Sequence, residues 1–158
     1  MIAKQHKRGG ATVGVLSHMD PWQAELIVNL RLWCEGCEGQ QMVWNCFAKS
    51  LPGTKAVAEF QTFETLISLL NSTCHRPLVR HQRTCACVGA DEAAFAHLVS
   101  TASQGDLGEA TLIATLLVRA AHAEHAAVLA AHVGCAARAI ATAKHLPGTP
   151  SQNVRRLH

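Results

Sequence analysis

The stretch DPWQAELIVNLRLWCEG, residues 20–36, has the pattern of an amphipathic helix. Asp20 can accept hydrogen bonds from first-turn amides, and a proline at the first helical position gives up no hydrogen bond. Apolar residues then recur at three- and four-residue spacing, which is the period of one helix face, and Gly36 is a typical stop. These apolar residues are Trp22, Leu26, Ile27, Leu30 and Trp33.

Five further segments carry the same helical pattern. Pro52-Gly53 separates the second helix from the third, Gly105 ends the fourth, and Asp106 caps the fifth. No segment shows the sustained period-two alternation of a half-buried strand. We therefore predict an all-α fold, with about six amphipathic helices in a compact single-domain bundle. The later helices are expected at residues 40–51, 54–73, 91–105, from 106 onward and 122–144, with Leu112, Ile113, Leu116 and Leu117 facing inward.

The length and composition of the chain fit one folded domain with short tails. A chain of 158 residues is about one domain long, since domains hold roughly 100 to 200 residues. Hydrophobic residues make up 49% and charged residues 16%, which excludes a wholly disordered protein. We expect a helical domain over residues 19–145, a disordered basic arm over 1–18 and a basic tail over 146–158.

The net charge of +3 comes from the tails. Five lysines and arginines lie in the two tails, whereas residues 19–145 hold nine of them against all eleven acidic residues. The predicted domain is therefore mildly acidic. Because nucleic-acid binding usually leaves a basic patch on the folded body, this distribution disfavours a nucleic-acid partner.

The sequence favours the cytoplasm over a membrane or an exported location. No apolar run reaches the roughly 18 residues of a membrane-spanning helix, and the basic start lacks a convincing signal-peptide cleavage site. In a cytoplasmic chain the seven cysteines are expected to be reduced thiols, metal ligands or redox groups rather than disulfides.

The segment CHRPLVRHQRTCAC, residues 74–87, is a Cys/His/Arg-rich loop between the third and fourth predicted helices. Cys34 and Cys37 form a Cys-x-x-Cys, and with Cys85 and Cys87 they could supply four thiolates to a tetrahedral zinc ion. Such a site would clip the loop onto the end of the first helix. The alternative is buried or incidental free thiols, since cysteine also packs as a small hydrophobe. The alternate ligands are Cys74, His75 and His81.

The loop arginines offer a second role. Arg76, Arg80 and Arg83 could bind a phosphate, a carboxylate or a partner, because guanidinium groups grip planar anions bidentately. The alternative is a solvated loop whose arginines pair with helix-borne acids such as Glu59 and Glu64.

Three functions are consistent with these patterns. The leading hypothesis is a small helical binding protein, regulatory or an adaptor, whose cysteine-rich loop is clipped by zinc or contacts a protein partner or a second copy of the chain. The second is a metal- or thiol-based redox sensor or enzyme. Enzymatic activity is the weaker expectation, because the Cys-x-x-Cys is predicted at a helix C-terminus, where the dipole disfavours thiolate, and no other catalytic constellation emerges. The third is an accessory nucleic-acid binder that uses the basic tails.

Overall fold

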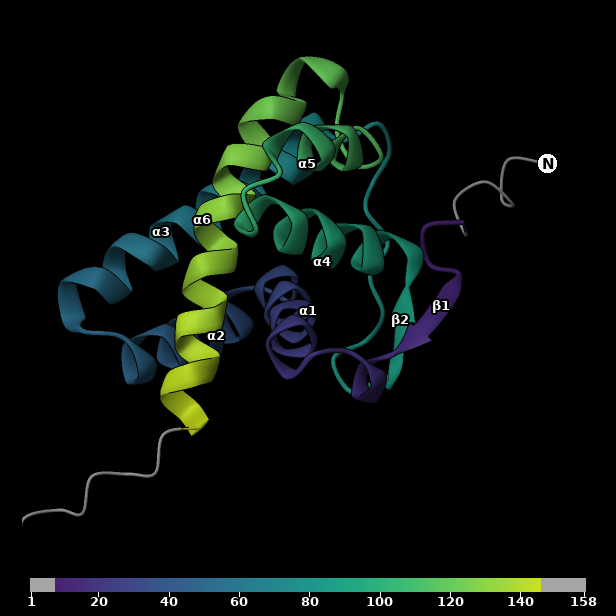
Figure 1. The fold of residues 1–158 in the computed structure, drawn as a ribbon. Coiled ribbons are helices and arrows are strands. Elements are labelled where there is room, and N and C mark those ends of the chain that lie inside the picture. Colours follow the sequence, from purple (N-terminus) through teal and green to yellow (C-terminus); the bar gives the residue numbers. More distant parts are fainter. Residues whose placement is uncertain (1–7, 146–158) are drawn as a thin grey trace, which may run out of the picture.

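In the part of the chain that the structure describes, the fold is built from six α-helices, as the periodicity predicts (Figure 1). The computed structural model describes residues 8–145, so the predicted basic tail at 146–158 and the first seven residues lie outside it. The expectation of an all-α fold of about six helices, with the cysteine-rich loop between the third and fourth, is confirmed. The helices are α1 (Pro21–Cys34), α2 (Cys37–Ser50), α3 (Gly53–Thr73), α4 (Ala90–Ser103), α5 (Leu107–Ala114) and α6 (Ala120–His145).

The long helix α6 packs against α3, α4 and α5 in the core. Its buried face is mainly alanine, which lets neighbouring helices approach closely. At Gly134 an added Cβ would lie 2.5 Å from the Ser103 Cβ and 2.8 Å from the Val99 carbonyl oxygen, so the crossing with α4 requires glycine. By length and composition α6 is also apolar enough to cross a membrane, but core helices of soluble proteins meet the same criterion.

An aromatic cluster joins the first three helices. Trp33 of α1 meets Phe60 and Phe63 of α3 edge-on, with ring centroids 5.5 and 6.0 Å apart. Trp44 and Phe47 of α2 pack edge-on against Phe60 from the other direction. Edge-to-face pairs at these distances add to the stabilisation from burial. The predicted apolar faces of these three helices therefore meet at one place.

Two short strands depart from the expectation that residues 1–18 form a disordered arm. Residues 12–15 form β1 (Thr12–Val15), which pairs antiparallel with β2 (Cys87–Gly89), and a 3₁₀ turn follows at Leu16–His18. Residues 11–16 supply hydrogen-bond partners for backbone groups on either side of β2. The Leu16 amide donates to the Ala86 carbonyl oxygen, and the Ala90 amide donates to the Ala11 carbonyl oxygen. Strands of three and four residues are too short to show alternation in the sequence.

The inward face of α5 differs from the predicted one. Ile113 is buried as expected, and so is Leu117 in the turn after the helix, whereas Leu112 and the turn residue Leu116 are 65% and 66% exposed. The helix ends at Ala114 after eight residues, and its buried residues are Ala110, Ile113 and Ala114. Because the chain leaves the helix at Thr115, the helical period no longer applies to Leu116 and Leu117.

Candidate functional site

The loop over residues 74–86 is held by two buried carboxylates in the first turn of α4. The Asp91 carboxylate accepts two hydrogen bonds of 2.8 Å from the Arg76 guanidinium and one of 2.8 Å from the Val79 amide. Glu92 accepts from the backbone amides of His81 and Gly89, each at 3.0 Å. Carboxylates are favoured at a helix N-terminus, where free amides carry partial positive charge. The start of α4 therefore anchors the loop at several points.

Glu92 also binds Arg31, which lies in the last turn of α1. The Arg31 Nε and Nη2 atoms lie 2.7 and 2.8 Å from the two carboxylate oxygens. Both side chains are 1% exposed, so this is a fully buried, bidentate ion pair. Burial opposes the charged form of Glu92, but hydrogen bonds from Arg31, Gly89 and His81 outweigh it and lower the pKa of the carboxyl. The hydrogen bond to Glu92 in turn raises the pKa of Arg31.

The rest of the Arg31 guanidinium holds the backbone around the Cys85-x-Cys87 motif. It donates to the carbonyl oxygen of Cys85 at 2.8 Å, to that of Cys87 at 2.7 Å and to that of Gln82 at 3.2 Å. Since Cys87 also pairs with Val15 of β1, one buried cation ties together α1, α4, the loop and the small sheet.

Cys85 lies beside a histidine. Its Sγ is 3.5 Å from Nδ1 of His81, and His81 Nε2 is 2.7 Å from the carbonyl oxygen of Gly10. A carbonyl can only accept, so Nε2 carries the proton and Nδ1 faces the thiol. The backbone amide of Cys87 and the His81 ring both lower the pKa of Cys85. The Gly10 carbonyl, followed by Cys85, raises the pKa of His81. Both shifts favour a thiolate beside an imidazolium.

Other thiols in the described part of the chain have different surroundings. Burial raises the pKa of Cys34 and that of Cys46. Cys37 and Cys135 are exposed to solvent. Among these thiols, Cys85 combines partial exposure with neighbours that stabilise the thiolate, and thiolate character and access are what make a cysteine reactive.

The predicted metal ligands are not gathered into one site. Cys34 ends α1 and Cys37 begins α2, so the Cys-x-x-Cys spans a turn at Gly36 instead of lying wholly at a helix C-terminus as we expected. The Cys74 Sγ faces the Asn71 carbonyl oxygen at 3.3 Å, and His75 Nε2 lies 2.9 Å from the Thr115 carbonyl oxygen. Within residues 8–145 no group of three or more Cys, His, Asp or Glu side chains is arranged to hold a metal ion.

Two arginines of the loop contact the end of α1. The Arg80 guanidinium donates to the Cys34 carbonyl oxygen at 3.1 Å, and Arg83 forms an ion pair with Glu35. With Arg76 paired to Asp91, two of the three loop arginines already have carboxylate partners. The expected pairing with acids of the helices therefore occurs, but the acids are Asp91 and Glu35 rather than Glu59 and Glu64.

Arg31 and Glu92 did not figure among the residues singled out from the sequence. The available signal was an arginine inside the mainly apolar run of residues 26–33, at a position one helical turn after Ile27 and therefore on the same face. Comparison of the chain with protein-family models, with curated proteins and with solved structures finds no match. The function is therefore inferred from the chemistry of the Cys85 site.

Proposed function

We propose that this chain is a regulatory binding protein that senses oxidants through the thiol of Cys85. The supporting observation is one arrangement: the Cys85 sulfur faces the His81 ring, and Cys87 follows two residues later on the same Arg31-held backbone. Redox-sensing cysteines are typically accessible, have a low pKa and lie next to a second cysteine that resolves the first oxidation product. Cys85 combines these properties.

The proposed chemistry uses a peroxide as oxidant. An electron pair of the Cys85 thiolate forms an S–O bond to the hydroxyl oxygen of the peroxide, the O–O bond breaks, and the electron pair of that bond leaves with the other oxygen. That oxygen takes up a proton and departs as water or an alcohol, and Cys85 becomes a sulfenic acid. The Cys87 thiol then attacks the Cys85 sulfur, loses its proton and releases water, which leaves a Cys85–Cys87 disulfide. A thiol reductant reverses the change by disulfide exchange.

The proposed signal is a change in how the loop is held. A disulfide between two cysteines that are separated by one residue closes a small ring, so the backbone of residues 85–87 must bend. We expect this bending to move the carbonyl oxygens of Cys85 and Cys87 away from the Arg31 guanidinium. Because Arg31 is buried, donors that lose these acceptors cannot bind water instead, and the folded state is destabilised. The pairing of β1 with β2 runs through the same residues. Oxidation is therefore expected to loosen β1 and alter binding to a protein partner or to a second copy of the chain.

Peroxide treatment of the reduced protein tests this function. We expect Cys85 to be the first cysteine to react, with loss of two hydrogen atoms from the peptide that contains Cys85 and Cys87. In the Cys87→Ser variant the sulfenic acid should persist and be trapped by dimedone at Cys85. The exposed Cys37 and Cys135 serve as internal controls, measured by mass spectrometry in the same sample. Equal rates at Cys37, Cys85 and Cys135 would rule out the sensor role.

Light scattering of the reduced and oxidised protein tests the binding part of the proposal. A change in oligomeric state that is reversed by a thiol reductant, and absent in Cys85→Ser, identifies a second copy of the chain as the partner. No change in mass, together with unchanged hydrogen exchange in residues 12–18, contradicts loosening of β1.

A further inference from the structure

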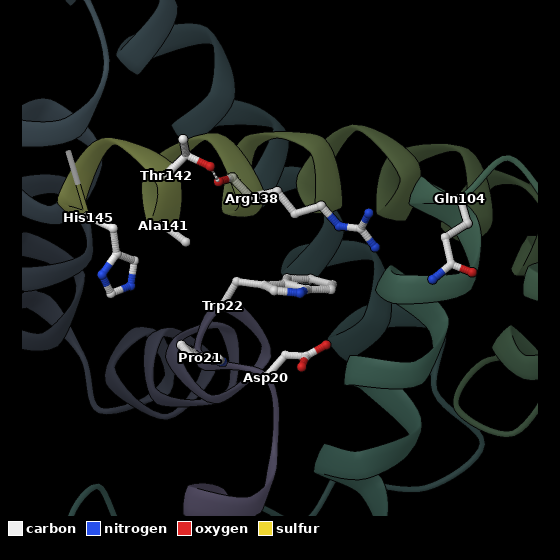
Figure 2. A pocket seen from close by; sticks show the side chains of 8 residues that line it. All are labelled: Asp20, Pro21, Trp22, Gln104, Arg138, Ala141, Thr142 and His145. Atoms are coloured by element: carbon white, nitrogen blue, oxygen red, sulfur yellow. Dashed lines mark hydrogen bonds between the residues drawn. The ribbon is translucent and has the colours of Figure 1, made fainter.

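A pocket of about 750 Å³ opens between the start of α1 and the last turns of α6 (Figure 2). This volume lies within the range of small-molecule sites, roughly 300–1,000 Å³. Trp22 forms one wall, Arg138 and Ala141 of α6 form another, and Gln104 at the end of α4 lies at the side. The pocket shares no residue with the Cys85 site, so its role is independent of the proposed function.

Arg138 provides a positive charge in this pocket. Its guanidinium carbon lies 4.7 Å from the centroid of the Trp22 ring, a distance at which the ring face attracts a cation. Its Nε is buried and has no acceptor within the described residues. The ion pairs found in residues 8–145 do not include Arg138. An arginine packed on an aromatic ring without a carboxylate partner is suited to bind a planar anion with its terminal nitrogens.

Asp20 provides a negative charge in the same pocket. It is the residue before α1, but its side chain makes no capping hydrogen bond to that helix. None of the ion pairs in the described part of the chain includes it. Figure 2 shows the Asp20 carboxylate and the Arg138 guanidinium on opposite sides of the Trp22 indole, with the Gln104 amide turned toward the same space. Within the described residues the side-chain amide of Gln104 makes one hydrogen bond, a long one of 3.5 Å to Ser100 Oγ.

The two opposite charges restrict the class of ligand. A simple anion would be attracted by Arg138 and repelled by Asp20, and the reverse holds for a simple cation. A molecule that carries both charges satisfies both residues. Pro21, Trp22 and Ala141 supply apolar surface beside them. We propose that this pocket binds a small zwitterion with an ammonium group, a carboxylate and an apolar or aromatic substituent, as in a free α-amino acid.

Titration of the full-length protein with L-phenylalanine tests the proposal. The readout is the indole N–H signal of Trp22 in a ¹⁵N-correlated NMR spectrum, assigned by its loss in Trp22→Phe. We expect a saturable shift with a Kd of about 1 mM or tighter, in line with the modest affinity of a ligand of this size. Phenylpropionate, which lacks the ammonium group, and phenethylamine, which lacks the carboxylate, should bind at least about tenfold more weakly.

Two substitutions locate the binding site. Arg138→Gln and Asp20→Asn should each weaken binding of L-phenylalanine by about tenfold or more, since each removes a charged hydrogen-bond partner. Arg119→Gln is the matched control, because it removes the same charge from an exposed arginine just before α6. If Arg138→Gln does not fold by circular dichroism, Asp20→Asn and Arg138→Lys carry the comparison. The absence of a saturable shift, equal binding of phenylpropionate, or unchanged binding by both folded pocket variants overturns the proposal.

Discussion

Arg31 and Glu92 are 61 positions apart in the chain and form a bidentate ion pair that is almost completely buried. Replacing such a pair with apolar residues can be neutral, whereas removing one partner leaves an uncompensated buried charge. The other hydrogen bonds of the Arg31 guanidinium go to the backbone carbonyl oxygens of Gln82, Cys85 and Cys87. The pair therefore couples the stability of the helical core to the conformation of the Cys85 site.

Glu92→Gln is expected to lower the free energy of unfolding by about 3 to 5 kcal/mol, because Arg31 keeps its charge and loses its counterion. Urea unfolding at neutral pH measures the effect. Glu35→Gln, which removes the exposed partner of Arg83, is the control and should change stability little. A double variant, Arg31→Met with Glu92→Met, should recover part of the loss. Equal effects of Glu92→Gln and Glu35→Gln would contradict a buried, coupled pair.

The lowered pKa of Glu92 predicts a loss of stability in acid. A carboxyl whose pKa is lower in the folded state contributes stability that is present above its unfolded pKa, about 4.3, and is lost as the pH falls through the folded value. The free energy of unfolding should therefore fall more steeply below about pH 4.3 in the wild type than in Glu92→Gln. Urea titrations from pH 7 to pH 3 compare the two slopes, and parallel curves would exclude this linkage.

Gly134→Ala should destabilise the protein by about 1 to 3 kcal/mol, the usual cost of inserting a methyl group into a packed core. The added Cβ would meet Val99 backbone at 2.8 Å and Ser103 Cβ at 2.5 Å, so α4 and α6 would have to separate. Gly53→Ala is the control, because its added Cβ meets nothing within 4 Å. Thermal unfolding should show a clear fall in Tm for Gly134→Ala alone. A similar Tm for both variants would mean that the helices separate at no cost.

Sequence periodicity predicted the helices because the spacing of apolar residues is a local signal, although it gave the wrong inward residues at Leu112 and Leu116. Phe63 lies in the core and Trp33 packs against the core, as their spacing indicates. The site was predicted only in part, since the loop was recognised but its anchors were not. Asp91 and Glu92 lie in the first turn of α4, and their partners Arg76 and Arg31 are set by tertiary packing, which periodicity does not encode. The pairing of residues 12–15 with residues 87–89 was not predicted either, because it too is set by tertiary packing.

Removal of metal should leave the fold unchanged. The loop is attached to α1 and α4 by Arg76, Arg80 and Arg83, and the described residues hold no metal-binding group. We therefore expect the same Tm and the same number of reactive thiols with and without a strong chelator. The Arg76→Gln variant should instead lower the Tm, because it removes the partner of Asp91. A chelator-dependent fall in Tm would support the zinc hypothesis for Cys34, Cys37, Cys85 and Cys87.

The thiol of Cys85 should ionise at a lower pH than an ordinary cysteine, because the Cys87 amide and the His81 ring stabilise its thiolate. The rate of alkylation by iodoacetamide follows the thiolate fraction, so its pH profile for Cys85 should have a midpoint below about 8.5, the pKa of a free cysteine. His81→Gln removes the ring that faces the thiol and should move the Cys85 midpoint upward, whereas the alkylation rate of the exposed Cys135 at a fixed pH should stay the same. Peptide mapping separates the two rates in one reaction, and circular dichroism checks that the variant folds. If the Cys85 midpoint is the same in wild type and in folded His81→Gln, the histidine does not activate the thiol, and the contact of 3.5 Å between Sγ and Nδ1 is a packing contact only.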